Sequence, residues 1–488
     1  MRKPILLALS LCFGLFLASC SDDANYEQVL KPSDASSPVT FTEFSPEEGA
    51  LRSRLYIHGS NFGTDPDLIK VTVGGKEAKV VASTGNIIHA QVMKRSYVGS
   101  NYNSDVNVQI FDQQGNTTTD YTFEKKFTYK PQWTVGTIFR KVDERGNATF
   151  AEGSFDGSYG EGGNLVCSDW LVFDPKYDES SGEDRLLFST NYDQGLYQLN
   201  MTQRTIKRLF PRTQYSSSQT FTFTHDGDTL ILSDDNGQAS SYIKPNLYYA
   251  LRSEGFRKLH VYSYGPCTYS AVCMPDGTKF YASWTNAAIY RQEPEGRAIP
   301  FADEHRTKCF TLAQISQLDG AHTRLMLHPS CKYMYIIAPT IHCILRSNYN
   351  AETRMFEYPT VVAGNFTQSG FAEGTGGAAR FATLWAGIFV KNDDYVMNPR
   401  ADGDEYDFYV AGNSGNDCIF KVTPDGVVTN VAGRANESKD GQTWGYVDGD
   451  PLQEARLQSP KGLAYDPTDQ TWYFYDYDYH AMRYMTVE

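Results

Sequence analysis

The sequence predicts an all-β protein whose larger part is a β-propeller. Short runs rich in Val, Ile, Tyr and Phe recur along the chain, separated by turns of Gly, Asp and Pro. A phrase built from several such runs repeats at a long period, most clearly over residues 370–426 and 445–484. Aromatic residues make up 14% of the 488 residues, which favours strands. A long-period repeat of short strands is typical of propeller blades.

The N-terminus predicts secretion and a lipid anchor. Arg2 and Lys3 precede an apolar run over residues 5–17, which is too short to span a bilayer as a permanent helix. The following Leu-Ala-Ser-Cys ends at Cys20 and matches the bacterial lipobox. We therefore predict a lipoprotein signal peptide over residues 1–19, a lipidated Cys20, and a flexible tether over residues 20–37. An ordinary secretory signal is the alternative.

The acidic stretch directly after Cys20 predicts where in the cell envelope the protein is located. Ser21-Asp22-Asp23 resembles the surface-export signal of Bacteroidetes lipoproteins, which implies the outer membrane and a body facing the cell exterior. An anchor that faces the periplasm is the alternative. Beyond the anchor, no stretch of the sequence is long and apolar enough to cross a membrane.

Charge and cysteine content exclude some classes of partner. Without residues 1–19 the chain loses two cations, so 42 basic residues stand against 58 acidic ones and the formal charge is −16. This balance argues against binding to nucleic acid. Seven cysteines remain after Cys12 and Cys20 are set aside, with no Cys-x-x-Cys pair, and most are interpreted as small buried apolar residues. No cofactor is predicted.

Residues 38–130 predict a separate β domain. Their strand-like runs alternate apolar and polar residues, as in 69–73, 87–92 and 106–110. The phrases Phe-Ser-Pro-Glu-Glu-Gly at 44–49 and Gly-Ser-Asn-Phe-Gly at 59–63 resemble an IPT/TIG domain, which implies an immunoglobulin-like sandwich. Such domains serve as spacers or docking modules, so no chemistry is assigned to this segment.

Residues 131–488 predict six blades. Each blade begins with an inner-strand phrase, such as Leu-Met-Leu-His-Pro at 325–329, followed by a second aromatic or β-branched run. The two C-terminal copies resemble NHL repeats, with Ala-Arg-Phe at 379–381 and Tyr-Val-Ala-Gly-Asn at 409–413. The first of them departs from the family pattern by one extra residue before Gly387 and by Asn413, where an Asp is expected. The resemblance implies a six-bladed NHL-type propeller.

The sequence also indicates how the propeller closes. The chain ends in a third strand with no fourth strand behind it, whereas Trp133–Ile138 resembles the fourth strand at Val428–Gly433. We therefore expect a strand near residues 133–140 to complete the last blade, which pairs two otherwise open sheet edges.

No catalytic or metal-binding residue is predicted. Asp476, Asp478 and His480 would share one face if a strand continued through them, but the NHL resemblance implies that they make turn hydrogen bonds. The histidines show no metal-ligand spacing, and no Gly-x-Ser-x-Gly elbow is present. Ligand binding is instead predicted for rings and arginines near strand starts or loops, with packing between blades as the alternative: Trp170, Tyr269, Trp284, Arg324, Trp385 and Trp444.

These features favour a non-enzymatic surface lipoprotein whose propeller binds a ligand. Resemblance to cell-surface proteins of Bacteroidetes glycan-uptake systems implies a polysaccharide or host glycan as ligand. It also implies an outer-membrane transporter complex as a further partner. Two alternatives stay open: a metal-dependent propeller enzyme of the lactonase or lyase kind, and a scaffold that grips another envelope protein.

Overall fold

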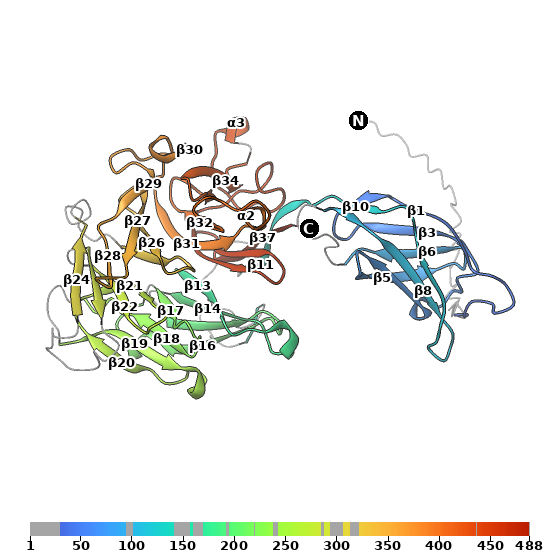
Figure 1. The fold of residues 1–488 in the computed structure, drawn as a ribbon, viewed down its shortest axis with the longest axis horizontal. Helices are drawn as coiled ribbons and strands as arrows, with labels where there is room; N and C mark the ends of the chain where they lie inside the picture. Colours follow the sequence, from blue (N-terminus) through green and yellow to red (C-terminus); the bar gives the residue numbers. More distant parts are fainter. Residues whose placement is uncertain are drawn as a thin grey trace, which may run out of the picture. The chain divides into compact units, whose positions relative to one another are not determined.

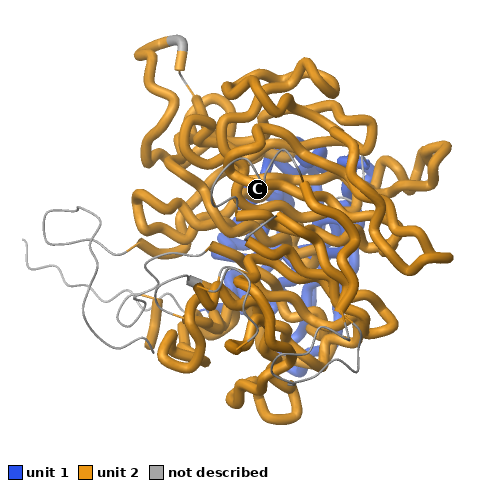
Figure 2. The backbone as a smooth tube through the Cα atoms, turned by 90° about the vertical axis from the view of Figure 1, so that its left-hand side faces the viewer, with its two compact units in different colours: residues 1–129 blue, residues 130–488 orange. Residues whose placement is uncertain are grey.

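The protein is described here from a computed structural model, which divides into two compact units, residues 1–129 and 130–488 (Figures 1 and 2). The structure describes residues 30–93, 101–140, 157–159, 169–191, 195–218, 220–237, 243–284, 287–292, 306–312, 322–435 and 437–487. The predicted signal peptide, Cys20 and residues 21–29 of the predicted tether lie outside these residues. None of the helices in the described ranges has the length and hydropathy needed to span a bilayer.

The first unit is a β-sandwich. Its larger sheet has the strand order β1 (Thr40–Ser45), β3 (Arg54–Ser60), β6 (Ile87–Gln91), β5 (Lys76–Ser83), β4 (Ile69–Val73), β8 (Val106–Phe111) and β9 (Thr117–Thr122). Its smaller sheet has the order β2 (Glu48–Gly49), β10 (Phe127–Tyr129) and β7 (Asn103–Ser104). The predicted alternation is visible in β8, whose residues are alternately buried and half-buried. Phe62 and Phe127 are buried in the core between the strands.

The described strands of the second unit form six sheets, which are the six blades of the predicted propeller. Blade 1 holds β12 (Gly157–Ser158), β13 (Trp170–Phe173), β14 (Leu186–Asn191), β15 (Gly195–Asn200) and β16 (Thr205–Pro211), and blade 2 holds β17 (Phe221–Phe223), β18 (Thr229–Ser233), β19 (Pro245–Leu251) and β20 (His260–Tyr264). Blade 3 holds β21 (Thr268–Cys273), β22 (Lys279–Ser283), β23 (Ala288–Gln292) and β24 (Arg306–Thr311). Blade 4 holds β25 (Arg324–Leu327), β26 (Tyr333–Ile337), β27 (Cys343–Asn350), β28 (Met355–Phe356) and β29 (Thr360–Gly364).

The last two blades complete the ring. Blade 5 holds β30 (Gly374–Thr375), β31 (Leu384–Lys391), β32 (Tyr406–Gly412), β33 (Cys418–Val422) and β34 (Val427–Gly433), and blade 6 holds β35 (Pro460–Asp466), β36 (Thr471–Asp476), β37 (Ala481–Val487) and β11 (Trp133–Arg140). The described helices are short, with α2 (Asp393–Met397) and α3 (Glu437–Asp440) in connections of blades 5 and 6. The first unit, this ring and the near absence of helix confirm the predicted all-β fold class.

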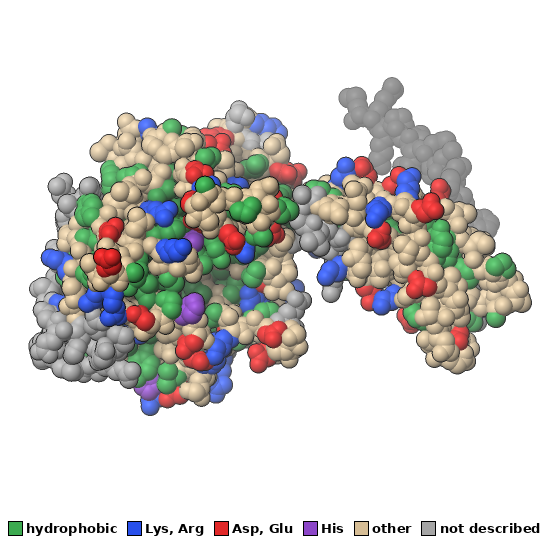
Figure 3. Space-filling view, in the orientation of Figure 1, with side chains coloured by type: hydrophobic (Ala, Val, Ile, Leu, Met, Phe, Trp, Pro, Cys, Tyr) green, Lys and Arg blue, Asp and Glu red, His purple; other side chains and the backbone are tan. Residues whose placement is uncertain are grey.

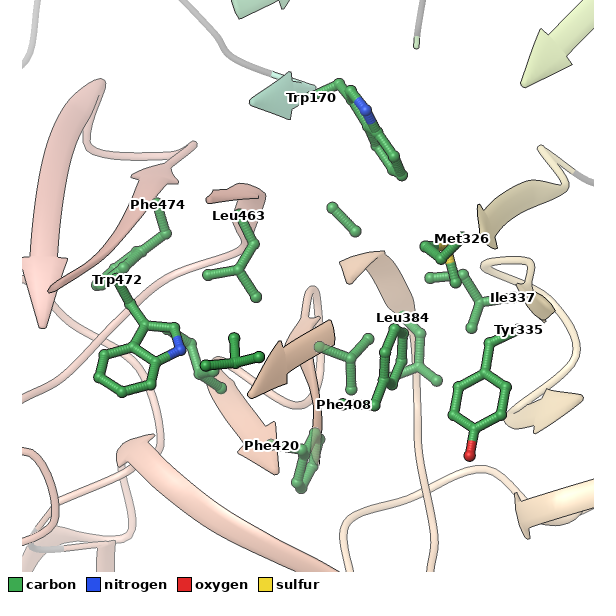
Figure 4. Packing of buried hydrophobic residues seen from close by; sticks show 14 of the residues in the cluster. Trp170, Met326, Tyr335, Ile337, Leu384, Phe408, Phe420, Leu463, Trp472 and Phe474 are labelled. Carbon is green, nitrogen blue, oxygen red and sulfur yellow. The ribbon is translucent and has the colours of Figure 1, made fainter. Parts of the chain in front are cut away.

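The inner strands of the blades are β13, β17, β21, β25, β31 and β35. Contacts join β17 to β21, β21 to β25, β25 to β31, β31 to β35 and β35 to β13. Blades 1 and 2 also join through the rings of Phe188 and Phe223, whose centroids are 5.3 Å apart. Apolar side chains from four inner strands, Trp170, Met326, Leu384 and Leu463, lie around one buried cluster (Figure 4). This cluster fixes the inner strands and therefore the positions of the residues at their ends.

Blade 6 is built from both ends of the second unit. Strand β11 pairs antiparallel with β37 along its whole length, from Trp133 opposite Val487 to Arg140 opposite Ala481. The pairing requires a glycine at position 136, because a Cβ there would overlap the ring of Tyr484. The first strand of the unit thus supplies the fourth strand of its last blade.

The buried side chain of Arg483 stabilises blade 6 through hydrogen bonds. Its side chain is fully buried and donates hydrogen bonds to Asp476 Oδ2 at 2.8 Å and to Asp448 Oδ1 at 2.8 Å. It also donates to the backbone carbonyl oxygens of Arg456 and Val447, at 2.7 and 2.6 Å. One guanidinium therefore ties β36 to the connection that leads into the blade.

Candidate functional site

Polar and aromatic residues gather where the inner strands begin. We call six of them the hub cluster, and they come from five blades: Asp169, Tyr269, His322, Arg324, Trp385 and Lys461. Each lies within the first two residues of an inner strand or within two residues before it. On the face of the propeller turned toward the viewer in Figure 3, charged side chains of both signs and histidines lie among hydrophobic ones.

Irregular strand pairing shapes the hub cluster. The register shifts between Thr268 and Ser270 in β21, and between Leu384 and Gly387 in β31. A third shift occurs directly after Lys461 in β35. Because a bulge leaves one residue unpaired and turns its side chain, these shifts re-aim side chains such as Tyr269 and Trp385 away from the regular blade pattern.

Trp385 lies at the centre of the hub cluster. The guanidinium carbon of Arg324 is 4.1 Å from the centre of its ring, and the Lys461 Nζ is also 4.1 Å from it. Both contacts are cation–π interactions, which are strongest for tryptophan. The indole Nε1 is buried and has no hydrogen-bond partner among the described residues, whereas part of the side chain remains exposed. Trp385 therefore offers a partly open, rigidly held ring.

Lys461 connects three of its neighbours. Its Nζ lies 3.3 Å from Asp169 Oδ1 and 3.7 Å from the centre of the Tyr477 ring, in addition to its contact with Trp385. The side chains of Lys461 and Asp169 are only 12% and 5% exposed, so solvent screens this ion pair little. The ammonium group is thus held between a carboxylate and two aromatic faces.

His322 adds a neutral polar group. Its ring stacks on Tyr269 at 4.4 Å, and its carbonyl oxygen accepts a hydrogen bond from Arg324 Nη1 at 3.1 Å. Burial, followed by the charge of Arg324, lowers the pKa of His322 to about 4. Burial also lowers the pKa of Arg324 to about 10, which still leaves it charged at neutral pH. The hub cluster therefore combines fixed cations, a carboxylate, a neutral imidazole and aromatic rings, a mixture suited to polyhydroxylated ligands.

Three of the six predicted ligand-binding residues meet in the hub cluster, namely Tyr269, Arg324 and Trp385. Tyr269 is 6% exposed and stacks on His322, and Arg324 is fully buried against Trp385, so neither presents much surface. Trp170 is 9% exposed and belongs to the apolar cluster, which is the packing alternative. Their ligand contacts stay a prediction.

The other two predicted residues lie outside the hub cluster. Trp284 is half-buried, and its backbone N–H donates to the Cys267 carbonyl oxygen at the start of blade 3. Trp444 is 45% exposed in the connection between β34 and β35. Ligand contact by Trp284 and Trp444 also stays a prediction.

Sequence reasoning did not select Asp169, His322, Lys461 or Tyr477. A signal existed only for Lys461, which is the variable residue of the Pro-x-Gly phrase of the last repeat. The other three stand in turns or before strands, where a residue's direction depends on the register of pairing.

One arrangement in blade 4 looks like a nucleophile beside a base. Ser330 Oγ lies 2.7 Å from His328 Nδ1, and His328 Nε2 lies 3.2 Å from Asp404 Oδ1. However, His328 Nδ1 also accepts the backbone N–H of Ser330, in the way that Asp174 accepts that of Lys176 in the matching turn of blade 1. The histidine therefore replaces a turn-forming aspartate, and the turn explains its contacts with Ser330. Its contact with Asp404 links blade 4 to blade 5.

The segment after β36 is a turn, which the sequence analysis favoured over a continuing strand. Strand β36 ends at Asp476 and residues 477–480 form a turn in which His480 has φ 49°, so Asp476, Asp478 and His480 do not share a strand face. Asp476 binds Arg483, and Asp478 accepts a hydrogen bond from Ser459 Oγ at 2.8 Å. In the described ranges, no group of three or more His, Cys, Asp or Glu side chains could hold a metal ion.

All six cysteines in the described part of the chain are free. Cys267, Cys273, Cys343 and Cys418 are buried, as expected for small apolar residues.

Comparison with known proteins supports both units. Residues 38–125 match the IPT/TIG domain, which confirms that part of the sequence interpretation. Among curated proteins, none matches the chain.

Solved structures resemble almost the whole chain. An auxiliary nutrient binding protein from Bacteroides thetaiotaomicron is 29% identical, with a TM-score of 0.63, and the match covers 94% of this chain and 99% of that one. An auxiliary nutrient binding protein from Bacteroides ovatus is 26% identical, with a TM-score of 0.74, and covers 94% and 100%. A third structure from Bacteroides thetaiotaomicron, described as a candidate phosphatase, is 23% identical with a TM-score of 0.63 and shows the fold alone. The chain is therefore similar along both units to nutrient-binding proteins of Bacteroides.

Proposed function

We propose that this protein is a non-enzymatic binding lipoprotein that captures a nutrient, a polysaccharide or host glycan, at the outer surface of the outer membrane. The observation that carries the proposal is its full-length similarity to two structures named auxiliary nutrient binding proteins. The lipobox at Cys20 and the acidic stretch after it support the location. The repeat phrases of the two C-terminal copies support an NHL-type propeller, and a glycan-uptake transporter complex is the proposed partner.

The hub cluster supports a carbohydrate as the nutrient. Sugars present hydroxyl groups that pair with carboxylates and cations, and C–H faces that lie on aromatic rings. Asp169, Lys461 and Trp385 bring these three kinds of group into one contact network, in which Asp169 and Lys461 are nearly buried and Trp385 keeps part of its side chain exposed. Because each group is held by its neighbours, little side-chain freedom is lost on binding.

Glycan arrays test this proposal. The full chain with Cys20→Ser, which removes only the lipid attachment, is applied with and without a chelator. Carbohydrate binding that resists the chelator is expected, and Trp385→Ala should weaken it at least 10-fold. Tyr358→Ala is the control, because Tyr358 is an aromatic residue that is 53% exposed, beside the outer strands of blade 4 and outside the hub cluster.

The same arrays separate the two rival functions. Turnover of a carbohydrate that disappears with the chelator would replace the proposal by the metal-dependent enzyme. No carbohydrate binding at all would favour the scaffold.

A further inference from the structure

A row of partly exposed aromatic side chains crosses blade 6 and ends at the hub cluster. We call Tyr446, Tyr479, Tyr477 and Trp385 the aromatic row. The rings of Tyr446 and Tyr479 are 5.3 Å apart, and Tyr479 shares the turn 477–480 with Tyr477. Lys461 Nζ then joins Tyr477, at 3.7 Å, to Trp385, at 4.1 Å. The row therefore runs from the connection before β35, through the turn 477–480, to the inner strand of blade 5.

Cations and hydrogen bonds hold the row in place. The Tyr446 hydroxyl bonds to Thr137 Oγ1 at 2.8 Å, and the Arg140 guanidinium lies 4.2 Å from the Tyr446 ring. Arg140 Nε also donates to the Tyr479 carbonyl oxygen at 3.2 Å. Rings fixed in this way are pre-organised for stacking, because they have few rotamers left to lose.

The aromatic residues of the row are only partly buried. Tyr477 is 37% exposed, and Tyr446, Tyr479 and Trp385 are each half-buried, whereas Tyr475 in the adjacent strand is fully buried. The equivalent connection of blade 5, between β32 and β33, is Asn-Ser-Gly-Asn-Asp at 413–417 and has no aromatic residue. The blade thus tolerates this turn without rings, which points to a use on the surface.

We propose that the aromatic row is a binding track for an extended carbohydrate chain, on which successive sugar units stack from Tyr446 to Trp385. This inference rests on the proposed function and narrows it, because it selects a chain of several units over a single sugar. The separation of the Tyr446 and Tyr479 rings is comparable to the length of one sugar unit.

The test compares affinity with chain length. Malto-, cello-, xylo- and manno-oligosaccharides of one to six units are titrated calorimetrically into the full chain with Cys20→Ser. In at least one series the dissociation constant should fall about 10-fold or more between one and four units. The double variant Tyr477→Ala with Tyr479→Ala should lose this dependence on length, whereas Tyr477→Phe with Tyr479→Phe, which keeps the rings, should retain most of it. Tyr358→Ala should match the unmodified chain.

Two results overturn the track in different ways. If glycans bind on the array but no series gains affinity with length, or if the double alanine variant binds as tightly as the unmodified chain, the track is wrong and the proposed function stands. If no carbohydrate binds at all, both are wrong. A thermal unfolding midpoint equal to that of the unmodified chain ensures that the variants are folded.

Discussion

Replacing Arg483 by methionine should weaken the propeller more than any single surface change. Arg483 is fully buried and is the cationic partner of Asp476, which is fully buried as well. Methionine fills similar space without charge, so it removes the ion pair and leaves the Asp476 carboxylate uncompensated. It also leaves the carbonyl oxygens of Arg456 and Val447 without this donor.

The magnitude follows from the buried charge. Removing one partner of a buried ion pair costs about 3–5 kcal/mol in the free energy of unfolding. Burial already raises the pKa of Asp476, and Arg483 is the main group that lowers it, so the variant should raise that pKa further. A folded-state pKa above the unfolded one means that the folded protein binds more protons in the window between the two values. The free energy of unfolding therefore decreases as pH rises through that window, and the loss should be larger at pH 8 than at pH 5.

Urea unfolding of the full chain, followed by tryptophan fluorescence at pH 5 and pH 8, measures the effect. The second variant combines Arg483→Met with Asp476→Asn. It also removes the Asp476 carboxylate charge, which the single change leaves without its cationic partner. The double variant should recover part of the loss and should lose its pH dependence. A single variant that costs under about 1 kcal/mol, or one whose loss is the same at both pH values, would refute the buried-charge reasoning.

Three further predictions concern the closure and the hub cluster. Gly136→Val should lower the free energy of unfolding by about 1–3 kcal/mol, because the new side chain overlaps the Tyr484 ring; an unchanged urea midpoint would contradict this. Lys461→Met should weaken carbohydrate binding and shift the fluorescence of Trp385, whose ring contacts Lys461 Nζ; calorimetry and emission spectra equal to those of the unmodified chain would speak against the site. Since the pKa of His322 falls to about 4 from 6.5, its contribution to stability is complete above pH 6.5 and is lost as pH drops toward 4. His322→Gln should therefore reduce the change of the thermal unfolding midpoint between pH 4 and 6.5. If the midpoints of the variant and of the unmodified chain change with pH in the same way, the lowered pKa of His322 is disproved.

The fold class could be predicted from the sequence because the packing of strands dictates its repeated patterns. The apolar alternation in β8 follows from one buried face, and the repeated inner-strand phrases follow from blades that each bury both faces. Trp133–Ile138 resembles a fourth strand, and β11 pairs with β37. The two-residue strands β12 and β30 carry no such pattern, because so short a segment is placed by its neighbours and not by its own residues.

The hub cluster could be predicted from the sequence only in part. Inner strands are buried on both sides, so the sequence does not say whether Trp170 faces the apolar cluster or the ligand side. The register shifts that turn Tyr269 and Trp385 have no sequence signal of their own. For residues 476–480 turn hydrogen bonds were favoured over a shared strand face, and β36 does stop at Asp476, where the backbone turns and His480 adopts a left-handed conformation.

Because β11 pairs with β37, blade 6 cannot be completed until the last strand of the propeller has been synthesised. Among the strands of the propeller, β11 emerges first and β37 last, so one edge waits unpaired while all the blades between them are made. Until the last strand is made, this early edge is open to wrong partners, including the same strand of another nascent chain. Late closure, as the last step of folding, is the consequence of completing the ring with its own first segment.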